Sequence, residues 1–312
     1  MNRIMARRNF VKTLALGMSA LAIPGLKSAF AAKHPEPTRK LKIGHTCITW
    51  GTFPRPDADA TLEPALKDIS AEGFWSFETF PEVLDSWDQK GLLTPLIEKY
   101  HVPLRSGYIT PNLLDPSIRK DEIARIVRLS KVVKKFNGTF IVLAPNSVKR
   151  DTYDFKEHRA DIVSALNDYA AAVTDLGLGT GLHQHTGTCI ETRDEVYSVM
   201  NAVNTNNLKF APDVGQLQKG GADAAKVVKD FLPLLKHMHL KDYKGWEYYS
   251  GYCPLGMGTV DIKAILDMSE SGGQNPDILV ELDPSKDGPM TPLETVQTTK
   301  TYLQKLGYSF RA

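Results

Sequence analysis

The sequence lacks the charge distribution and the cysteine spacing that mark several common classes of protein. Its 38 Lys and Arg residues nearly balance 36 Asp and Glu residues, giving a net charge of +2 over 312 residues. With no basic stripe either, nucleic acid is not expected as a partner. The three cysteines, Cys47, Cys189 and Cys253, show neither CxxC spacing nor the density of a disulfide framework. We therefore expect them to pack as small buried hydrophobic side chains.

The sequence also shows no nucleotide-binding loop motif and no apolar stretch typical of a membrane span. No GxGxxG follows the first apolar run, and no GxxxxGK[ST] occurs anywhere in the chain. The apolar stretch at residues 13–23 is too short and too weakly hydrophobic to span a bilayer stably. With 42% hydrophobic and 24% charged residues, the composition is that of a globular protein.

The first 31 residues have the three-part plan of an export signal. A basic segment precedes the apolar stretch, and Ala29-Phe30-Ala31 then forms a small-x-small cleavage site. The basic segment contains Arg7-Arg8-Asn9-Phe10-Val11-Lys12, which resembles the twin-arginine motif almost position for position. We predict a twin-arginine signal peptide at residues 1–31 and a leader at residues 32–40. The predicted location is periplasmic, with the twin-arginine export machinery as a partner and without a stable membrane anchor.

From residue 41 onward, short apolar runs alternate eight times with longer amphipathic segments. The runs are residues 41–47, 74–79, 102–108, 139–144, 179–184, 208–213, 237–241 and 277–282. The clearest helical patterns are residues 117–136, 156–176, 191–203, 222–235 and 291–306. Such alternation is typical of parallel strands joined by crossover helices, and eight units match a closed (β/α)8 barrel. We predict an α/β fold, a single TIM barrel domain at residues 41–312, with a doubly wound open sheet as the alternative.

Ionisable side chains gather at the C-terminal ends of the predicted strands, where TIM barrels carry their chemistry. Because side chains alternate along a strand, the apolar face should pack under the helices and the polar face should point to the barrel axis. Four consecutive strands thereby direct His183, Asp213, His239 and Glu281 toward one point. Two imidazoles and two carboxylates suit a divalent ion such as Mn²⁺, Zn²⁺ or Co²⁺, and burying them together costs free energy unless they pair or bind a cation. We predict these four residues as metal ligands.

Several of these residues belong to longer motifs. The segments are His237-Met-His-Leu-Lys-Asp242, Ala211-Pro-Asp-Val-Gly-Gln216, Val280-Glu-Leu-Asp-Pro284 and Tyr252-Cys-Pro-Leu-Gly-Met-Gly258. They resemble the sugar phosphate isomerase/epimerase superfamily with its xylose-isomerase-like barrel, over nearly the whole mature chain. The stretch His183-Gln-His-Thr-Gly-Thr188 is most similar to the inosose dehydratase branch. The resemblance implies one divalent ion held by strands five to eight, Mn²⁺ foremost, with Zn²⁺, Co²⁺ or Mg²⁺ as alternatives.

Two positions depart from the family's pattern. Many epimerases of the family have Glu where this chain has His183, and they use it with the strand-eight Glu, here Glu281, to transfer protons across the substrate. The family's Asp-x-x-His on strand six is Asp213-Val-Gly-Gln216 here, so Gln216 can orient a hydroxyl but cannot act as a base. Both departures favour a lyase, a dehydratase or a related reaction with one dominant base over symmetric epimerisation.

The remaining polar residues at the strand ends are assigned to catalysis and to substrate binding. We predict His185 as the acid–base residue, with Glu281 able to share that role. Lys241 is predicted to hold a substrate oxyanion or hydroxyl, and a salt bridge to Asp242 or Glu281 is the alternative. The predicted substrate-binding residues are Glu78, His45, Gln216 and Trp50. Glu78 could instead orient a metal ligand.

The predicted export limits the range of possible substrates, because phosphorylated sugars are scarce outside the cytoplasm. We expect a metal-dependent sugar isomerase, epimerase or carbon–oxygen lyase that acts on an unphosphorylated keto-sugar, keto-glycoside or cyclitol. Two alternatives stay open: a non-catalytic sugar-binding barrel, and a metal-dependent hydrolase or endonuclease of the same superfamily. Few histidines and the lack of a basic groove count against the endonuclease. A homo-oligomer is compatible with these features.

Overall fold

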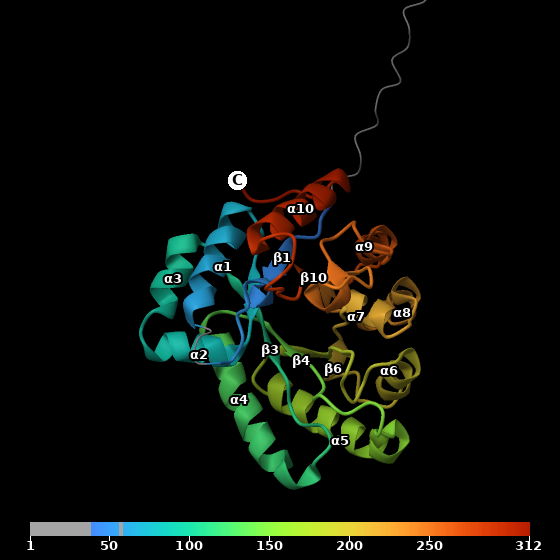
Figure 1. Cartoon of the computed structure of the whole chain (residues 1–312). Coiled ribbons are helices and arrows are strands. Elements are labelled where there is room, and N and C mark those ends of the chain that lie inside the picture. Colours follow the sequence, from blue (N-terminus) through green and yellow to red (C-terminus); the bar gives the residue numbers. More distant parts are fainter. Residues whose placement is uncertain (1–38, 56–58) are drawn as a thin grey trace, which may run out of the picture. The chain divides into compact units, whose positions relative to one another are not determined.

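The central feature of the fold is a nearly closed barrel of eight parallel strands with helices around it, which confirms the predicted TIM barrel (Figure 1). A computed structural model describes residues 39–55 and 59–312. Neighbouring strands follow the order β6-β5-β4-β3-β2-β1-β10-β7. Two isolated parallel bridges, Phe210 with Leu235 and Asp213 with His239, connect the first and last strands of that order.

The barrel strands are short and coincide with the predicted runs. They are β1 (Ile43–Thr46), β2 (Phe77–Thr79), β3 (Leu104–Ile109), β4 (Phe140–Leu143), β5 (Gly179–Leu182), β6 (Leu208–Phe210), β7 (His237–Leu240) and β10 (Asp277–Val280). Seven lie wholly within a predicted run, and β3 extends one residue past its run. Apolar residues on both faces of a strand suit a parallel barrel, because helices cover one face and other strands' side chains fill the inside.

Ten α-helices are found in the described part of the chain, and the longest match the predicted amphipathic segments. They are α1 (Asp59–Ala71), α2 (Pro81–Gln89), α3 (Leu93–Tyr100), α4 (Arg119–Lys135), α5 (Phe155–Thr174), α6 (Arg193–Met200), α7 (Val214–Lys219), α8 (Ala224–Asp230), α9 (Ile262–Ser271) and α10 (Pro292–Lys305). Short 3-10 turns are η1 (Cys47–Trp50), η2 (Pro116–Ile118), η3 (Leu232–Leu234) and η4 (Tyr249–Gly251). Capping boxes start α6 and α10, with Thr192 paired to Glu195 and Thr291 to Glu294.

The structure adds an antiparallel hairpin after β7 that the eightfold pattern did not predict. Its strands are β8 (Asp242–Tyr243) and β9 (Tyr252–Cys253). The buried Asp242 carboxylate accepts hydrogen bonds from the backbone N–H groups of Tyr243, Gly256, Gly258 and Val260, at 2.9 to 3.1 Å. Asp242 therefore fastens the segment that follows β9, and the alternative of a salt bridge between Asp242 and Lys241 is not what the structure shows.

Gly258 shows how closely this segment packs against the carboxylate. A Cβ atom at position 258 would lie 2.2 Å from Asp242 Oδ1 and 2.5 Å from the Tyr243 carbonyl oxygen. No side chain fits there without displacing the backbone. The Gly-Met-Gly sequence thus allows four N–H groups to converge on one carboxylate beside the barrel mouth.

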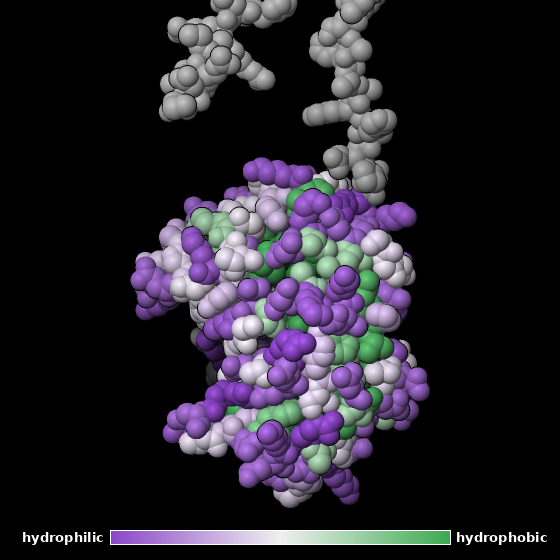
Figure 2. Space-filling view, turned by 90° about the vertical axis from the view of Figure 1, so that its right-hand side faces the viewer, coloured by the Kyte–Doolittle hydropathy of each residue, from purple (hydrophilic) through white to green (hydrophobic). Residues whose placement is uncertain are grey.

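The main hydrophobic core lies between the strands and the helices, and it includes all or part of most elements. Cys47, Cys189 and Cys253 are buried and free, which confirms the prediction made for them. Figure 2 shows the side that carries α7 to α9, which is mostly hydrophilic with smaller hydrophobic areas between the polar ones. Of the helices in residues 39–55 and 59–312, none is long and apolar enough to cross a membrane.

The predicted signal peptide and most of the predicted leader lie outside the described residues. The last two leader residues are described, and they already contact the barrel. The Arg39 guanidinium pairs with Asp267 of α9 at 2.5 Å, and the Lys40 N–H donates to Glu270 at 3.1 Å. Residues 39 and 40 are therefore fixed to α9 rather than belonging to a free linker.

Candidate metal centre

The four predicted ligands all lie at the C-terminal end of the barrel, each fixed by the backbone of its strand or of the next helix. His183 follows β5, and its N–H donates to the Leu143 carbonyl of β4 at 2.9 Å. Asp213 follows β6 and caps α7, because its Oδ1 accepts from the Gln216 N–H at 3.0 Å. His239 lies within β7, and Glu281 follows β10 directly.

Three of these residues form a compact group of potential metal ligands. One ligand atom each of His183, Asp213 and His239 lies within 4.8 Å of the others, and all three side chains are buried. The fourth, Glu281, joins the group through His239, since its Oε2 lies 3.0 Å from His239 Nδ1. The structure thus brings together the four residues that strand parity selected.

His183 tests whether the residues present suit a metal ion. Neither of its ring nitrogens has a hydrogen-bond partner among the described residues, although the side chain is completely buried. An unsatisfied buried polar group costs about 1–3 kcal/mol, so such a group needs an explanation. Burial, assisted by the charge of His239, holds the pKa of His183 well below its usual value, so the imidazole is neutral. A neutral imidazole with an open lone pair is the state that binds a divalent ion.

Glu78 of β2 orients the imidazole of His239 from inside the barrel. Its Oε1 lies 2.6 Å from His239 Nε2, and its Oε2 lies 3.1 Å from His237 Nε2 and accepts from Ser106 Oγ at 2.5 Å. Burial alone would raise the pKa of Glu78, but His239 and His237 outweigh it and hold that pKa below its usual range. A carboxylate on one ring nitrogen leaves the other nitrogen, Nδ1, for a metal. This arrangement matches the alternative in which Glu78 orients a ligand.

Glu78, His237 and His239 also form a second group with metal-ligand chemistry. The 2.6 Å contact between Glu78 and His239 is a direct hydrogen bond. Two ligands of one tetrahedral ion lie about 3 Å or more apart, so Glu78 Oε1 and His239 Nε2 are hydrogen-bonded to each other rather than placed to bind one ion together. The ion site is therefore assigned to the group that contains His183.

Lys241 is completely buried next to the candidate ligands. Its Nζ lies 2.7 Å from Glu281 Oε1, 2.8 Å from Asp283 Oδ1 and 3.2 Å from Asp213 Oδ2. The Tyr252 ring covers it at 4.5 Å. Burial alone would lower the pKa of Lys241, but the three carboxylates outweigh it and raise that pKa well above its usual value. Lys241 therefore stays protonated and paired with these carboxylates, in agreement with the alternative of a salt bridge to Glu281.

Glu281 keeps its negative charge despite its burial. Burial alone would raise the pKa of its carboxyl group, but Lys241 and His239 outweigh it and hold that pKa well below the usual range. The side chain also lines a small cavity at the barrel mouth. An ionised carboxylate at this position can accept a proton from a molecule bound at the barrel mouth.

His185 is fixed in one tautomer by Thr186 and Gln216. Its Nδ1 must carry the hydrogen, because it lies 2.7 Å from the Thr186 carbonyl oxygen, which can only accept. Gln216 Oε1 accepts from the N–H and hydroxyl of Thr186, so the amide NH₂ faces His185 Nε2 at 2.7 Å. The lone pair of His185 is therefore occupied by Gln216. Gln216 reaches the site through His185 rather than by lining the cavity.

His45 and Trp50 are not brought to the cavity. Thr46 lines it, and His45 precedes Thr46 on β1, so its side chain leaves the strand on the other face. The His45 ring packs against Trp50 at 5.3 Å and Phe74 at 5.1 Å, and burial lowers its pKa to about 4. The Trp50 indole N–H donates to Asp68 of α1 at 2.9 Å.

The cavity is also lined by residues that were not predicted as site residues from the sequence. It encloses about 30 Å³, room for an ion with a water or two, and its lining is Thr46, Ile48, Glu78, Thr79, Phe80, Tyr108, His185 and Glu281. Tyr108 is the most notable of the missed residues, since its ring lies 5.1 Å from that of His183 and 5.9 Å from that of His239. It ends the third predicted run on the same strand face as Val102 and Leu104, so the parity rule would have placed it under the helices rather than on the axis.

The fold and the site define a (β/α)8 barrel with a candidate divalent-metal centre at its C-terminal mouth. The chain belongs to the family described as Xylose isomerase-like TIM barrel, whose model matches residues 64–305. This membership confirms the resemblance to the superfamily.

Three known proteins illustrate the relationship. An inosose dehydratase of Clostridium perfringens (strain ATCC 13124) is 30% identical over 220 residues, which is 65% of this chain and 72% of the relative. The IolI protein with a bound zinc atom has a TM-score of 0.67 at 17% identity, covering 86% of this chain and 98% of IolI. The 3-keto-D-glucoside 4-epimerase YcjR of E. coli has a TM-score of 0.63 at 17% identity, covering 86% and 99%. At this level of sequence identity, the two similarities to solved structures support the fold and nothing further.

Proposed function

We propose that this chain is a divalent-metal-dependent sugar isomerase, epimerase or carbon–oxygen lyase that acts on an unphosphorylated keto-sugar, keto-glycoside or cyclitol. The observation that carries the proposal is His183, buried beside Asp213 and His239 with both ring nitrogens unpartnered. An inosose dehydratase among its relatives, the zinc in IolI and the keto-glucoside in the name of YcjR support a metal and a keto substrate.

The ion would be held by His183, Asp213, Glu281 and the Nδ1 atom of His239, and we favour Mn²⁺ over Zn²⁺, Co²⁺ and Mg²⁺. When bound, a divalent ion supplies Lewis-acid polarisation of a carbonyl, which acidifies the neighbouring C–H group. Glu78 fixes the ring of His239 in the orientation this requires. Lys241 neutralises the second oxygens of Asp213 and Glu281, which limits the negative charge around the site.

Glu281 is the best-placed proton acceptor. Its carboxylate is ionised, lines the cavity and is held by the Lys241 ammonium. His185 can take a proton at Nε2 only after Gln216 releases that atom, so we assign it the secondary role. With His183 where many epimerases have Glu, the site offers one dominant base. Loss of the C–H proton to Glu281 and its return to a departing hydroxyl group releases water, which is a dehydration.

The substrate is proposed to be uncharged. Among the described residues that line the cavity, none is Lys or Arg, and Lys241 is already bound by three carboxylates. A phosphate or carboxylate group would meet no Lys or Arg side chain there, and it would lie close to Glu78 and Glu281. This agrees with export by the twin-arginine route, which we propose as the route to the periplasm.

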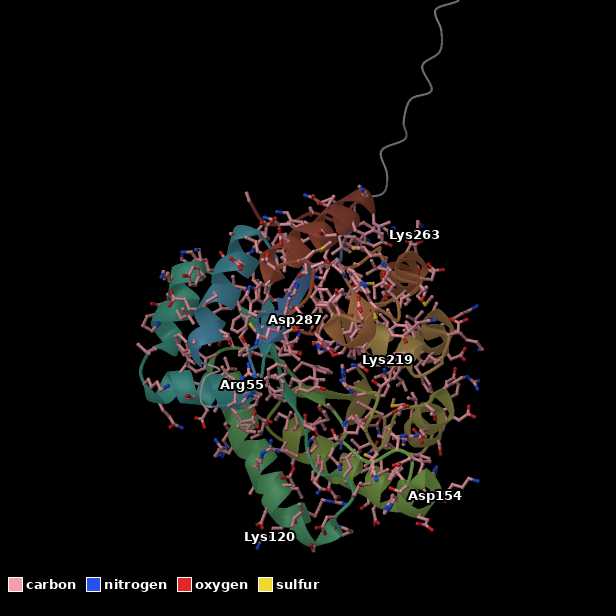
Figure 3. All side chains as sticks on the ribbon, in the orientation of Figure 1. Arg55, Lys120, Asp154, Lys219, Lys263 and Asp287 are labelled. Carbon is pink, nitrogen blue, oxygen red and sulfur yellow. The ribbon has the colours of Figure 1, made fainter. Side chains whose placement is uncertain are left out.

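Deuterium incorporation from D₂O into a panel of keto-sugars, with and without chelator, tests the proposal. We expect α-carbon exchange or water loss that requires the metal and disappears in His183→Ala. Lys120→Ala is the control, since Lys120 lies at the outer edge of the molecule in Figure 3. Exchange that is indifferent to chelator would contradict the proposal. Bound metal without exchange on any member of the panel would indicate a sugar-binding barrel instead.

A further inference from the structure

The barrel mouth is divided into a polar side and an aromatic side. The candidate metal ligands come from β5, β6, β7 and β10. On the opposite side lie three half-buried aromatic residues, which we call the aromatic wall: Phe53 after the turn η1 that follows β1, Phe80 directly after β2, and Tyr108 within β3.

The aromatic wall starts at the metal ligands and runs away from them. The Tyr108 ring stacks on His239 at 5.9 Å with 20° between the planes. Phe80 contacts Tyr108 edge-on at 5.3 Å, and Phe53 contacts Phe80 at 5.8 Å. Tyr108 and Phe80 line the cavity together with Glu281, whereas Phe53 does not. The wall therefore begins inside the cavity and extends beyond it.

The outer end of the wall, Phe53, lies beside Arg55. The Arg55 guanidinium lies 5.2 Å from the centre of the Phe53 ring. Figure 3 shows Arg55 toward the centre of the view, with Lys219 and Asp287, whereas Lys120 and Lys263 lie at the outer edge. Phe53 thus lies next to Arg55 and outside the set of residues that line the cavity.

The position of Phe80 indicates that this aromatic residue serves something other than helix stability. Phe80 is the N-cap of α2 and makes no capping hydrogen bond from its side chain. Ser, Thr, Asp or Asn at this position would stabilise the helix by about 1 kcal/mol. Pro81 follows at N1 and keeps Phe80 extended, with φ −69° and ψ 131°. A local sequence choice that gives up stability is a common sign of a functional position.

We propose that Phe80 and Phe53 form a subsite for a second ring bonded to the reactive sugar, so that the substrate is a glycoside. Aromatic faces bind ligand rings that present C–H or π surfaces, and they need no charge. One sugar ring at the metal ligands would cover Tyr108, which leaves two further rings of the wall for the next ring of the ligand. The inference rests on the proposed function only in placing the reactive sugar at the metal centre.

The test measures equilibrium binding of three unreactive probes to the Mn²⁺-loaded full chain by isothermal titration calorimetry. The probes are methyl β-D-glucoside, phenyl β-D-glucoside and cellobiose, which add no ring, an aryl ring and a sugar ring. We expect at least one two-ring probe to bind more tightly than the methyl glucoside, and the phenyl and cellobiose arms identify which ring is preferred.

Variants of Phe53 test whether this side chain causes the tighter binding of a two-ring probe. Phe53→Ala should weaken the preferred two-ring probe about two- to tenfold, the usual range for one aromatic contact, and leave the methyl glucoside unchanged. Phe53→Tyr should retain the tight binding. Trp246→Ala is the matched control, because Trp246 is a half-buried aromatic residue of the segment between β8 and β9 on the polar side.

Equal binding of all three probes, binding of none, or an equal loss for all three in Phe53→Ala would overturn the subsite. The exchange experiment on free keto-sugars does not involve Phe53, so the two proposals fail separately. Metal-dependent exchange without ring discrimination removes only the subsite. Ring discrimination without exchange removes the catalytic proposal and leaves the subsite in place.

Discussion

Negatively charged side chains outnumber positively charged ones at the candidate metal centre. The carboxylates of Asp213, Glu281 and Asp283 surround the single ammonium of Lys241, so three negative charges and one positive charge leave −2. A divalent ion brings this group to neutrality. With a fourth carboxylate at the position of His183, as in many epimerases, the same group would remain negative. His183 therefore suits both the ligand geometry and the charge of a site that already contains three carboxylates.

Substitution of His183 should separate metal binding from folding. We expect His183→Ala to weaken Mn²⁺ binding at least tenfold, because one ligand is lost, while removal of an unpartnered buried ring leaves the fold intact. His183→Glu should retain binding, because the carboxylate is also a ligand. Calorimetric titration with Mn²⁺ measures both. His158→Ala in α5 is the matched control, and equal affinity in His183→Ala would contradict the ligand assignment.

The three cysteines give a second prediction for individual residues. Burial raises the pKa of each thiol, to about 12 for Cys189 and Cys253, and that of Cys47 still higher. Since the thiolate is the reactive form, all three should resist a thiol reagent in the native protein and react after unfolding. Colorimetric thiol counting in buffer and in guanidinium chloride measures this. One thiol that reacts rapidly in the native state would show that its neighbourhood opens.

The sequence predicted which residues of runs five to eight come together at the barrel mouth, but it misplaced His45 and Trp50. Runs five to eight each have one polar and one apolar face, so their alternation shows which residues point to the axis. In run one, His45 shares its strand face with Ile43 and Cys47. Thr46 lies on the other face with Lys42, so the same alternation, applied to this run, would have placed Thr46 rather than His45 on the axis. Phe80 was missed because an aromatic residue at a strand end is typical of ordinary packing.

The hairpin after β7 shows how one element depends on one carboxylate. Asp242→Ala removes the acceptor of four backbone N–H groups. We expect a loss of about 2–4 kcal/mol in the free energy of unfolding, because hydrogen bonds to charged groups contribute about 1.5–3 kcal/mol each and water replaces some of them. Hydrogen exchange should quicken in residues 252–260. Chemical denaturation and exchange mass spectrometry measure the two effects.

Asp261→Ala provides the comparison for that experiment. Asp261 caps α9 through one hydrogen bond, to the Ala264 N–H at 3.0 Å. Its loss should cost about 1 kcal/mol and leave exchange in residues 252–260 unchanged. Equal effects of the two substitutions would mean that Asp242 is an ordinary surface carboxylate in energetic terms.

The α7 helix and the β8–β9 hairpin, which the sequence did not predict, are too short to show periodicity. The α7 helix has six residues, and each strand of the β8–β9 hairpin has two. Hydrophobic alternation needs about four residues in a strand and about eleven in a helix to be recognised. These elements form because side chains cap or fasten them, as Asp213 does for α7. The helices α4, α5 and α10 are long enough to be predicted from their hydrophobic periodicity.

For the whole molecule, the predicted export signal can be tested in cells. Arg7→Lys together with Arg8→Lys should leave the protein in the cytoplasm if the twin-arginine route carries it. Cell fractionation followed by immunoblotting measures the distribution. Arg3→Lys is the control for a general loss of basic charge. Undiminished export of the double variant would exclude the twin-arginine route.

The proposed reaction depends on a divalent ion at the mouth of the barrel. Anomalous diffraction from crystals grown with Mn²⁺ tests this most directly. We expect one strong peak about 2.0–2.3 Å from ligand atoms of His183, Asp213, His239 and Glu281, the usual range for nitrogen and oxygen ligands. Lys241 should keep its contact with Asp283. A peak at Glu78 and His237 instead, or none at the mouth at saturating Mn²⁺, would contradict the account.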